Sequence, residues 1–444
     1  MTDIDRTVPP RPNIVFIVAD DLGYADLGCY GGRAAGFGAV SPVLDGLAAA
    51  GIRFTEGYAN SPVCSPTRFA LATGRYQYHF RGAAEEPLHG TGARRFGLSS
   101  SEPTVASLLK SEGYQTALVG KWHLGYPPEG GPLRSGYDEF FGPIAGGVDY
   151  WSHCNGGGQH DLWLGEETCA QEGYLTDLLS RRAVDYIDRM AAGPAPFFLS
   201  LHYTAPHWPW ETRDDPEMAK HVAGKLFHLD GGDIETYRRM IHHMDEGIGW
   251  VMDCLRKHGL ERDTLVIFTS DNGGERFSDN WPLVGGKMDL TEGGIRVPWI
   301  AHWPAAIPPG SVSAQHCMTM DWSATVIDVA GAQPHPDHPL DGICLLPVLR
   351  EPAATFPRAM YWRMKHRGQR AFRAGEWKYL RVDEHDYLFN IANDARERAN
   401  LGRHHPARLE AMRENWEAWD AAMPDIPADA AVTLVCTARD MPAR

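Results

Sequence analysis

Long hydrophobic runs are missing from this sequence. The longest apolar stretches, Asn13–Ala19 and Pro196–Leu201, are far shorter than the roughly 20 residues that a bilayer-spanning helix needs. The chain begins with a polar, proline-rich lead, followed by an apolar run that ends at two aspartates, which is unlike a signal peptide. We therefore predict a cytoplasmic protein, of bacterial type, that has no membrane partner.

Cysteine is scarce, and the cysteines do not form closely spaced pairs in the sequence. No Cys-x-x-Cys pair occurs among the eight cysteines, which are Cys29, Cys64, Cys154, Cys169, Cys254, Cys317, Cys344 and Cys436. This spacing excludes a cysteine-built zinc site and favours free thiols over a disulfide framework. Cys154 and Cys169 could pair across a glycine-rich loop, but unlinked thiols are the preferred interpretation.

An excess of positive charge is also absent. The formal net charge is -15 at pH 7. Such a charge repels polyanions at long range, which argues against nucleic acid and anionic membranes as partners. A small anionic substrate remains compatible, because it responds to the local field of a cleft rather than to the charge of the whole molecule.

The residues that are present indicate a globular α/β protein. With 444 residues and 43% hydrophobic content, the chain can form one large domain and a smaller one. Short apolar runs alternate with helical patterns, as in a large, mostly parallel sheet flanked by helices. The predicted buried strands are Ile14–Ala19, Gln115–Gly120, Phe197–Tyr203, Thr264–Ser270 and Val297–Ala301.

Helices are predicted from their caps and periodicity. Ser41 and Pro42 open a helix that closes at Gly51, and the other predicted helices are Ser101–Glu112, Leu175–Met190 and Ile234–His258. After about residue 350, short alternating segments and a polar helix, His405–Ala422, follow. We predict a catalytic domain over residues 1–350 and a small antiparallel domain with a helix over residues 351–444.

Acidic side chains follow two of the predicted strands. Asp20 and Asp21 come directly after the first strand, and Asp271 and Asn272 come directly after the strand LVIFTS. Ligands of open α/β sheets bind beyond the carboxyl ends of the strands, so these oxygens are expected to meet at one edge. Hard oxygen ligands favour Ca²⁺ or Mg²⁺ over zinc. Alternatively, both pairs are ordinary turn formers.

A cysteine stands at the start of a predicted helix. In SPVCSPTRFALATGRY, Cys64 lies just before the helix, and Arg68 follows one turn along. A group at this position faces free backbone N–H donors and the positive end of the helix, which suits an oxyanion. The alternative is a buried cysteine without function.

Further cationic and titratable side chains follow other strands. Lys121 and His123 are predicted to leave one face of a strand, two residues apart. His207 lies between two prolines, and Lys287 follows two glycines that allow close approach of a ligand. We interpret all four as candidate site residues.

Read together, these segments resemble the sulfatase family. The Cys-x-Pro-x-Arg run at Cys64–Arg68, continued by ALATGRY, resembles its signature, as do NIVFIVADDLGYADLGCYG, GKWHLG, APHWPW, FTSDNGG and GGIRVPW. The resemblance covers residues 13 to about 350 in the expected order. YLFNIANDARERANL resembles the closing segment of the family, although the usual Asp-Pro is Asp394-Ala395 here.

The resemblance implies an alkaline-phosphatase-like fold and a set of roles. Cys64 would be oxidised to formylglycine by a separate maturation enzyme. Together with Cys64, the ligands of one cation, Ca²⁺ or alternatively Mg²⁺, would be Asp20, Asp21, Asp271 and Asn272.

The remaining roles also come from the resemblance. Arg68 and Lys121 would stabilise the charge on the nucleophile. His207, beside Lys287, would protonate the departing alcohol. His123 would remove the proton whose loss releases sulfate. The substrate would be a small aryl or carbohydrate sulfate, and an oligomeric state is compatible.

One segment points to substrate contacts. GPIAGGVDYWSH resembles the N-acetylgalactosamine-4-sulfatase and arylsulfatase B branch of the family. By that resemblance Asp149, Tyr150, Trp208 and Trp210 are candidate substrate contacts, with buried packing as the alternative for the tryptophans.

Two other functions compete with a sulfatase. One is a phosphate or phosphonate ester hydrolase of the same superfamily, against which Asn272, rather than histidine, after Asp271 argues. The other is a catalytically silent sulfate-binding protein in which Cys64 stays a thiol. The complete set of polar residues argues against a protein that only binds.

Overall fold

The computed structural model describes residues 11–32, 39–217 and 232–434. Its centre is a ten-stranded sheet with the order β11-β2-β10-β9-β1-β8-β4-β5-β6-β7. The strands are β1 (Asn13–Ala19), β2 (Ile52–Phe54), β4 (Gln115–Gly120), β5 (Glu139–Pro143), β6 (Leu162–Leu164), β7 (Glu167–Thr168), β8 (Phe197–His202), β9 (Thr264–Ser270), β10 (Trp299–His302) and β11 (Ser311–Ser313). A separate pair joins β3 (Gly57–Tyr58) to β12 (Cys317–Met318).

The middle of this sheet is parallel, as predicted. β9, β1, β8, β4 and β5 pair in parallel in that order, and β1 is buried along almost its whole length. The expectation of a central parallel strand at Val297–Ala301 is wrong, because β10 begins at Trp299 and runs antiparallel to β9. An apolar run buried on both faces gives no indication of strand direction, so the sequence could not distinguish the two.

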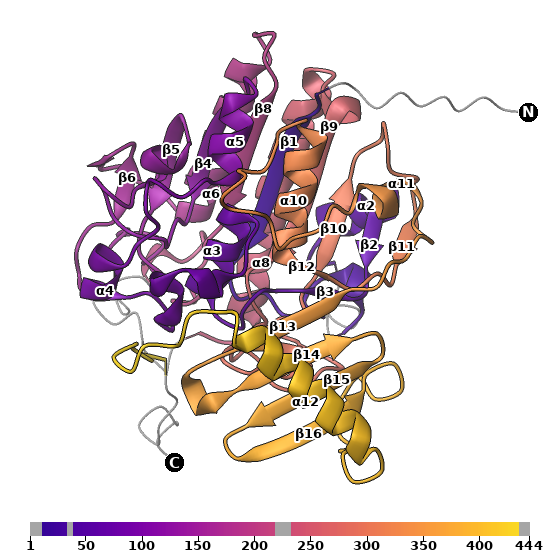
Figure 1. Cartoon of the computed structure of the whole chain (residues 1–444). Coiled ribbons are helices and arrows are strands. Elements are labelled where there is room, and N and C mark those ends of the chain that lie inside the picture. Colours follow the sequence, from indigo (N-terminus) through magenta and orange to yellow (C-terminus); the bar gives the residue numbers. More distant parts are fainter. Residues whose placement is uncertain (1–10, 33–38, 218–231, 435–444) are drawn as a thin grey trace, which may run out of the picture.

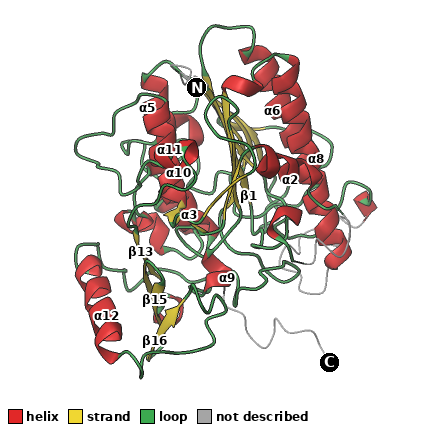
Figure 2. Cartoon of the chain, turned by 90° about the vertical axis from the view of Figure 1, so that its right-hand side faces the viewer, coloured by secondary structure: helices red, strands yellow, loops and turns green. Residues whose placement is uncertain are grey.

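Helices cover both faces of the sheet (Figure 2). One face is covered by α2 (Pro42–Ala50), α6 (Leu175–Met190) and α8 (Ile234–Lys257), and the other by α3 (Cys64–Thr73), α5 (Val105–Ser111) and α10 (Thr319–Val329). Short helices α4 (Gly90–Arg95), α9 (Glu292–Ile295) and α11 (Leu346–Arg350) lie in the connections. The α/β fold class predicted from the sequence is confirmed.

One predicted helix start and one predicted capping bond need correction. α5 begins at Val105 rather than Ser101, because Thr104 caps it in a reciprocal arrangement with Ser107, at 3.0 Å and 2.9 Å. α2 does begin at Pro42, but Ser41 makes no capping bond. Its hydroxyl instead lies 3.1 Å from the Asp45 carboxylate.

The end of the chain forms a second, smaller sheet beside the carboxyl ends of the central strands (Figure 1). Its antiparallel strands are β13 (Ala359–Arg363), β14 (Arg370–Ala374), β15 (Trp377–Val382) and β16 (His385–Asn390), followed by α12 (Pro406–Asp420). Trp362 donates its indole N–H to the Ala59 carbonyl at 2.9 Å and shares a core cluster with Tyr58 and Met318. The domain boundary near residue 350 stays a prediction, since this core joins both parts.

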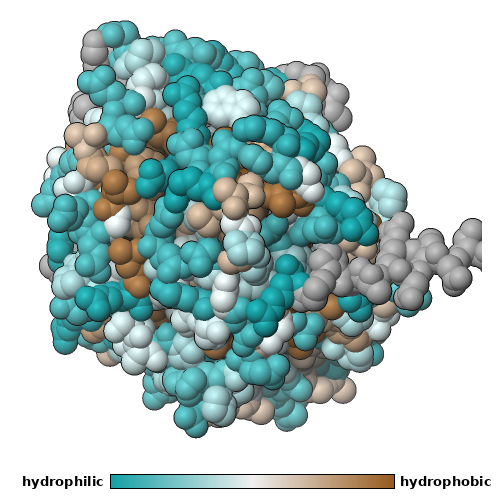
Figure 3. Space-filling model, turned by 90° about the horizontal axis from the view of Figure 1, so that it is seen from above, coloured by the Kyte–Doolittle hydropathy of each residue, from teal (hydrophilic) through white to brown (hydrophobic). Residues whose placement is uncertain are grey.

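Two predictions about thiols and membranes can be compared with the described residues. Within those residues all seven cysteines are free, including Cys154 and Cys169, while Cys436 lies outside them. No helix in the described part of the chain combines the length and hydropathy needed to cross a membrane. Seen from above, hydrophilic residues cover most of the surface (Figure 3).

Candidate active site

The acidic residues that follow β1 and β9 meet at the carboxyl edge of the sheet. The two strands are parallel neighbours, so Asp20 and Asp21 emerge beside Asp271 and Asn272. The backbone N–H of Asp21 donates to Asp271 Oδ1 at 3.2 Å, and the Asn272 amide donates to Asp21 Oδ1 at 2.7 Å. All four side chains are buried. The predicted convergence of oxygen ligands is therefore present.

Three cations surround these carboxylates. Lys121 Nζ lies 2.6 Å from Asp20 Oδ2, Lys287 Nζ lies 2.7 Å from Asp21 Oδ2, and the Arg68 guanidinium lies 2.8 Å from Asp271 Oδ2. Burial, reinforced by Asp271, raises the pKa of Asp20 well above its ordinary value. At Asp21 burial acts in the same direction, but Lys287 and His207 outweigh it and lower the pKa.

The oxygen set fits a hard divalent cation. Asp20 Oδ1 and Asn272 Oδ1 are buried and have no hydrogen-bond partner among the described residues. Ligand atoms of Asp20, Asp21 and His207 lie within 4.8 Å of one another. Buried oxygens without partners are costly unless a cation or donor satisfies them, and carboxylates suit Ca²⁺ and Mg²⁺. The identity of the ion stays a prediction.

Cys64 is the first residue of α3, one position further into the helix than predicted. Its N-cap neighbour Val63 has an extended backbone, and Cys64 is only 2% exposed. Burial raises the pKa of the Cys64 thiol, although Lys121 and Lys287 act in the opposite direction. The side chain thus faces both the cations of the site and the free N–H groups of the first helical turn.

Lys121 and His123 lie in a loop after β4, and the sequence did not indicate this loop. β4 ends at Gly120, and His123 has a positive φ of 57°, so alternation along a strand does not apply here. His123 Nε2 lies 2.8 Å from the Leu88 carbonyl oxygen, which can only accept a hydrogen bond. The proton therefore sits on Nε2 and the buried, unpartnered Nδ1 keeps its lone pair.

His207 lies across the site from His123. Its Nδ1 donates to the Trp208 carbonyl at 2.5 Å, which turns Nε2 to within 3.5 Å of Asp21 Oδ2. Burial lowers the pKa of His207, and Asp21 opposes that shift. Burial, together with Lys121, also lowers the pKa of His123 well below its ordinary value.

Two consecutive glycines lie against both imidazoles. A Cβ atom on Gly146 would lie 2.5 Å from His123 Cε1, and one on Gly147 would lie 3.1 Å from His207 Cε1. The first distance is far below van der Waals contact. Side chains at these positions would displace the rings, so the glycines are needed for close approach of this loop.

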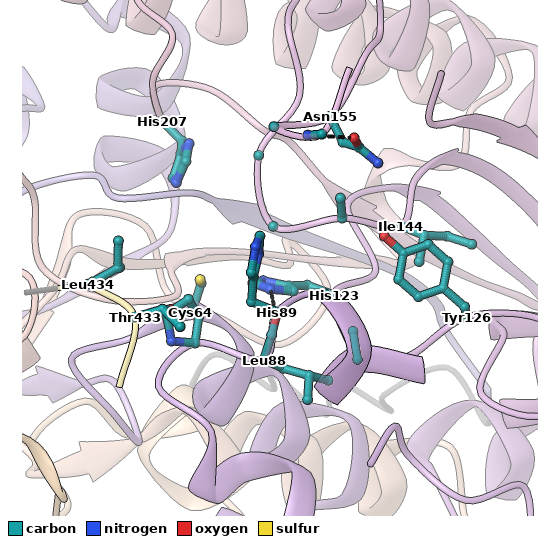
Figure 4. Close-up of a pocket in the computed structure, with 18 of the residues that line it drawn as sticks. Cys64, Leu88, His89, His123, Tyr126, Ile144, Asn155, His207, Thr433 and Leu434 are labelled. Atoms are coloured by element: carbon teal, nitrogen blue, oxygen red, sulfur yellow. Dashed lines mark hydrogen bonds between the residues drawn. The ribbon is translucent and has the colours of Figure 1, made fainter. Parts of the chain in front are cut away.

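A cavity of about 580 Å³ opens above these residues (Figure 4). Cys64, His123, His207 and Lys287 line it. Its other walls include His89, Arg94, Tyr126, Asn155, Gln159, Thr433 and Leu434, none of which the sequence analysis identified. These residues stand outside the motifs and come together only through the fold, so no pattern in the sequence indicated them.

The predicted substrate contacts lie in two different environments, and of the four only Trp208 lines the cavity. Trp208 lines the cavity beside His207, with ring centroids 4.2 Å apart. Asp149 and Tyr150 are fully buried and do not line it, because Tyr150 donates its hydroxyl to the His207 carbonyl and Asp149 accepts from backbone N–H groups of its own loop. Trp210 packs on Phe277 in the protein interior. Asp149, Tyr150 and Trp210 therefore support the site from behind.

A mostly parallel sheet with converging oxygen side chains at the carboxyl ends of its central strands is the arrangement in which α/β enzymes bind their ligands. A family model described as Sulfatase matches residues 12–332. The chain is 34% identical to N-acetylgalactosamine-6-sulfatase of Sus scrofa over 80% of its own length and 69% of the relative. It is also 34% identical to arylsulfatase A of Homo sapiens, over 83% of this chain and 74% of that one. The chain thus belongs to the sulfatase family, a group of sulfuric ester hydrolases.

Solved structures agree with this assignment. The crystal structure of Ps i-CgsB in complex with k-i-k-neocarrahexaose superposes with a TM-score of 0.80 at 32% identity, covering 92% of both chains. The phosphonate monoester hydrolase of Agrobacterium radiobacter has a TM-score of 0.64 at 20% identity, covering 93% of this chain and 96% of that one, which shows a shared fold. Several curated relatives are longer, and the chain spans about 66% of the Rattus norvegicus N-acetylgalactosamine-6-sulfatase.

Proposed function

We propose that this protein hydrolyses a carbohydrate sulfate monoester to an alcohol and inorganic sulfate, with Cys64 matured to formylglycine and one Ca²⁺ bound by Asp20, Asp21, Asp271 and Asn272. The observation that carries the proposal is the position of Cys64. It lies at the start of α3, in a cavity whose floor also holds two histidines and a lysine beside a cluster of buried oxygen ligands.

Formylglycine and the cation would each contribute to the reaction. When present, formylglycine supplies a hydroxyl nucleophile and the cation supplies charge that activates it. The surrounding residues fit both groups, because Cys64 faces Lys121 and Lys287 and the oxygen cluster contains unpartnered atoms. A separate maturation enzyme is the partner that this proposal requires. Mg²⁺ is the alternative cation.

The residues of the chain divide the chemistry among them. Arg68 and Lys121 are buried, and the side chain of Lys287 is 4% exposed. These three cations can hold the oxygens of the sulfate group. Because His207 Nδ1 already donates to the Trp208 carbonyl, Nε2 can protonate the leaving alcohol only when the ring is an imidazolium. Burial disfavours that form and the Asp21 carboxylate, 3.5 Å from Nε2, favours it, so we assign the acid role to His207 paired with Asp21. His123 has a free Nδ1 lone pair and a low pKa, which suit a base.

A carbohydrate is favoured over a simple aryl group by the size of the cavity. Cavities of a few hundred Å³ enclose a drug-sized ligand, and this one is about 580 Å³. Trp208 offers an aromatic face beside the reacting groups. Ps i-CgsB, a relative by structure, was solved with a neocarrahexaose.

The decisive experiment combines mass analysis with turnover. Protein produced together with a maturation enzyme should contain formylglycine in the peptide that carries Cys64, and it should release sulfate from sulfated sugars. Cys64→Ala should lose nearly all turnover while unfolding at the same temperature as the parent. Turnover of this variant within a few fold of wild type would contradict the covalent mechanism, and preference for a phosphonate ester would favour the other hydrolase class.

A further inference from the structure

The cavity has an unusual charge for this protein. The chain carries 57 acidic residues and a net charge of -15, yet no aspartate or glutamate occurs among the described residues that line the cavity. Arg94 and Lys287 line it, together with three histidines. Lys287 is paired with Asp21 and burial lowers the pKa of His123 and His207, so Arg94 is the cation of this wall that can attract an anion, even though the whole molecule repels anions.

Arg94 is a cation that the sulfate chemistry does not use. Its guanidinium carbon lies 4.7 Å from the centre of the Tyr126 ring, in a cation–π contact. Figure 4 shows Tyr126 across the cavity from Cys64 and His207, with His123 between them. Arg94 therefore stands on the far wall, away from the reacting sulfate.

Arg94 is exposed, and its contact with Tyr126 sets its position. Tyr126 packs edge-on against Trp163, with ring centroids 6.5 Å apart. Among the described residues, no carboxylate forms an ion pair with Arg94. The ring occupies one face of the guanidinium, and the N–H groups around its edge remain able to bind a planar or tetrahedral anion.

We propose that Arg94, seated on Tyr126, binds a second anionic group of the substrate. This inference rests on the proposed function and narrows its substrate class to a saccharide that carries another sulfate or a carboxylate besides the reacting sulfate. Lys287 at the floor and Arg94 at the far wall then act as two separate anion sites in one cavity.

The test compares substrates that differ by one charge. Steady-state kinetics would use 4-nitrophenyl sulfate, a monosulfated disaccharide, and two disaccharides with the same reacting sulfate that add either a second sulfate or a carboxylate. Wild-type kcat/KM should rise about tenfold or more with the added anion, as expected for a charge-assisted contact. The two doubly charged substrates distinguish sulfate from carboxylate as the preferred group.

Variants assign this gain to Arg94. Arg94→Gln should abolish the advantage of the doubly charged substrate, Arg94→Lys should keep part of it, and neither should change turnover of 4-nitrophenyl sulfate by more than about twofold. Arg95→Gln is the matched control, because Arg95 is an exposed neighbour on α4 whose guanidinium packs on Phe96 and does not line the cavity.

Two failures can be told apart. If wild type hydrolyses every sulfate ester equally well, or if Arg94→Gln slows all substrates alike, the second anion site is refuted while the sulfatase assignment stands. If the matured protein hydrolyses no sulfate ester, the proposed function fails and this inference fails with it.

Discussion

At the scale of single residues, the two histidines show how hydrogen bonds to carbonyl groups can fix the state of an imidazole. The Leu88 carbonyl holds the proton of His123 on Nε2, and the Trp208 carbonyl holds that of His207 on Nδ1. Opposite nitrogens are therefore left facing the site. This difference follows from backbone geometry, which motif spacing alone does not indicate.

The first prediction distinguishes the roles of His207 and His123 by using substrates whose leaving groups differ in acidity. Because His207 protonates the alcohol, His207→Ala should lose about 10² to 10⁴ in rate on a sugar sulfate but much less on an aryl sulfate with an acidic phenol. His123→Ala should release about one equivalent of phenol in a burst and then stall, measured by stopped-flow absorbance.

The control is His153→Ala, whose ring bonds the Gly173 carbonyl in a different loop and does not line the cavity. A His207 defect of equal size on both kinds of ester would show that the leaving group is not its target. Absence of a burst in His123→Ala would remove that ring from the release step.

At the scale of elements, the best predicted segments are those whose hydrophobic pattern matches their burial in the fold. The span of β4, the span of α6 and the convergence of the four oxygen-bearing side chains after β1 and β9 match the prediction, because apolar strands and amphipathic helices carry their burial in their pattern. The approach of His123 and the cavity wall at Tyr126 depend on loops, whose conformation is set by contacts distant in sequence. The burial of Asp149 and Tyr150 behind the cavity also depends on the conformation of a loop, so it could not be predicted from the sequence.

The second prediction concerns the contact between the small sheet and the loop that carries Lys287. Lys378 on β15 is fully buried between Glu292 and Glu397, at 2.9 Å and 2.8 Å. Lys378→Met should lower the free energy of unfolding by about 3 to 5 kcal/mol, because the buried Glu397 carboxylate loses its ion pair and Glu292 keeps only its longer contacts with Arg296 and Arg373, at 3.5 Å and 3.6 Å. Urea denaturation measures this change.

The matched variant for that network is Lys378→Met combined with Glu292→Gln and Glu397→Gln, which removes the unpaired charges. It should recover much of the lost stability. A single Lys378→Met as stable as wild type would show that the network contributes nothing to docking of the small sheet.

The third prediction concerns pH and the loop behind the cavity. Burial, reinforced by the Asp149 carboxylate, raises the pKa of Glu211 to about 9 from an ordinary value of 4.5. Glu211 also accepts the Tyr150 backbone N–H, and Tyr174 donates its hydroxyl to the Glu211 carbonyl. The folded state therefore holds a proton that the unfolded state releases, so stability should fall as pH rises from about 4.5 to 9.

Thermal unfolding across that range would measure the effect. Glu211→Gln keeps the acceptor oxygen and removes the titration, so its unfolding temperature should vary less with pH than that of wild type. The difference between the two proteins isolates this group from the other titrating residues. Parallel curves for the two proteins would contradict the raised pKa of Glu211.

At the scale of the whole molecule, charge is distributed unevenly. An acidic chain has a cation-lined cavity at one edge of its sheet, and three buried carboxylates there lie beside Arg68, Lys121 and Lys287. This distribution permits a small anion to enter while large polyanions are repelled.

The fourth prediction is that a chelator abolishes turnover and lowers the unfolding temperature. A cation that binds only the folded state stabilises it by about 2.7 kcal/mol at a hundred times its dissociation constant. Scanning calorimetry measures the unfolding temperature, and a sulfate-release assay measures turnover. Both are carried out with EDTA and then after separate addition of Ca²⁺ and Mg²⁺. Asp271→Asn should weaken recovery by Ca²⁺. An unfolding temperature and turnover that EDTA leaves unchanged would refute the cation site.

The far end of the chain has a consequence for the order of events during synthesis. Thr433 lines the cavity, and the backbone of Thr433 donates to the Glu86 carbonyl at 3.0 Å. If Cys64 is modified, the maturation enzyme must reach it before folding buries it. At about 5 to 20 residues per second, translation from Cys64 to Thr433 takes about 20 to 70 s. The cavity wall at Thr433 can form only after this interval, so the cavity above Cys64 is completed late in synthesis.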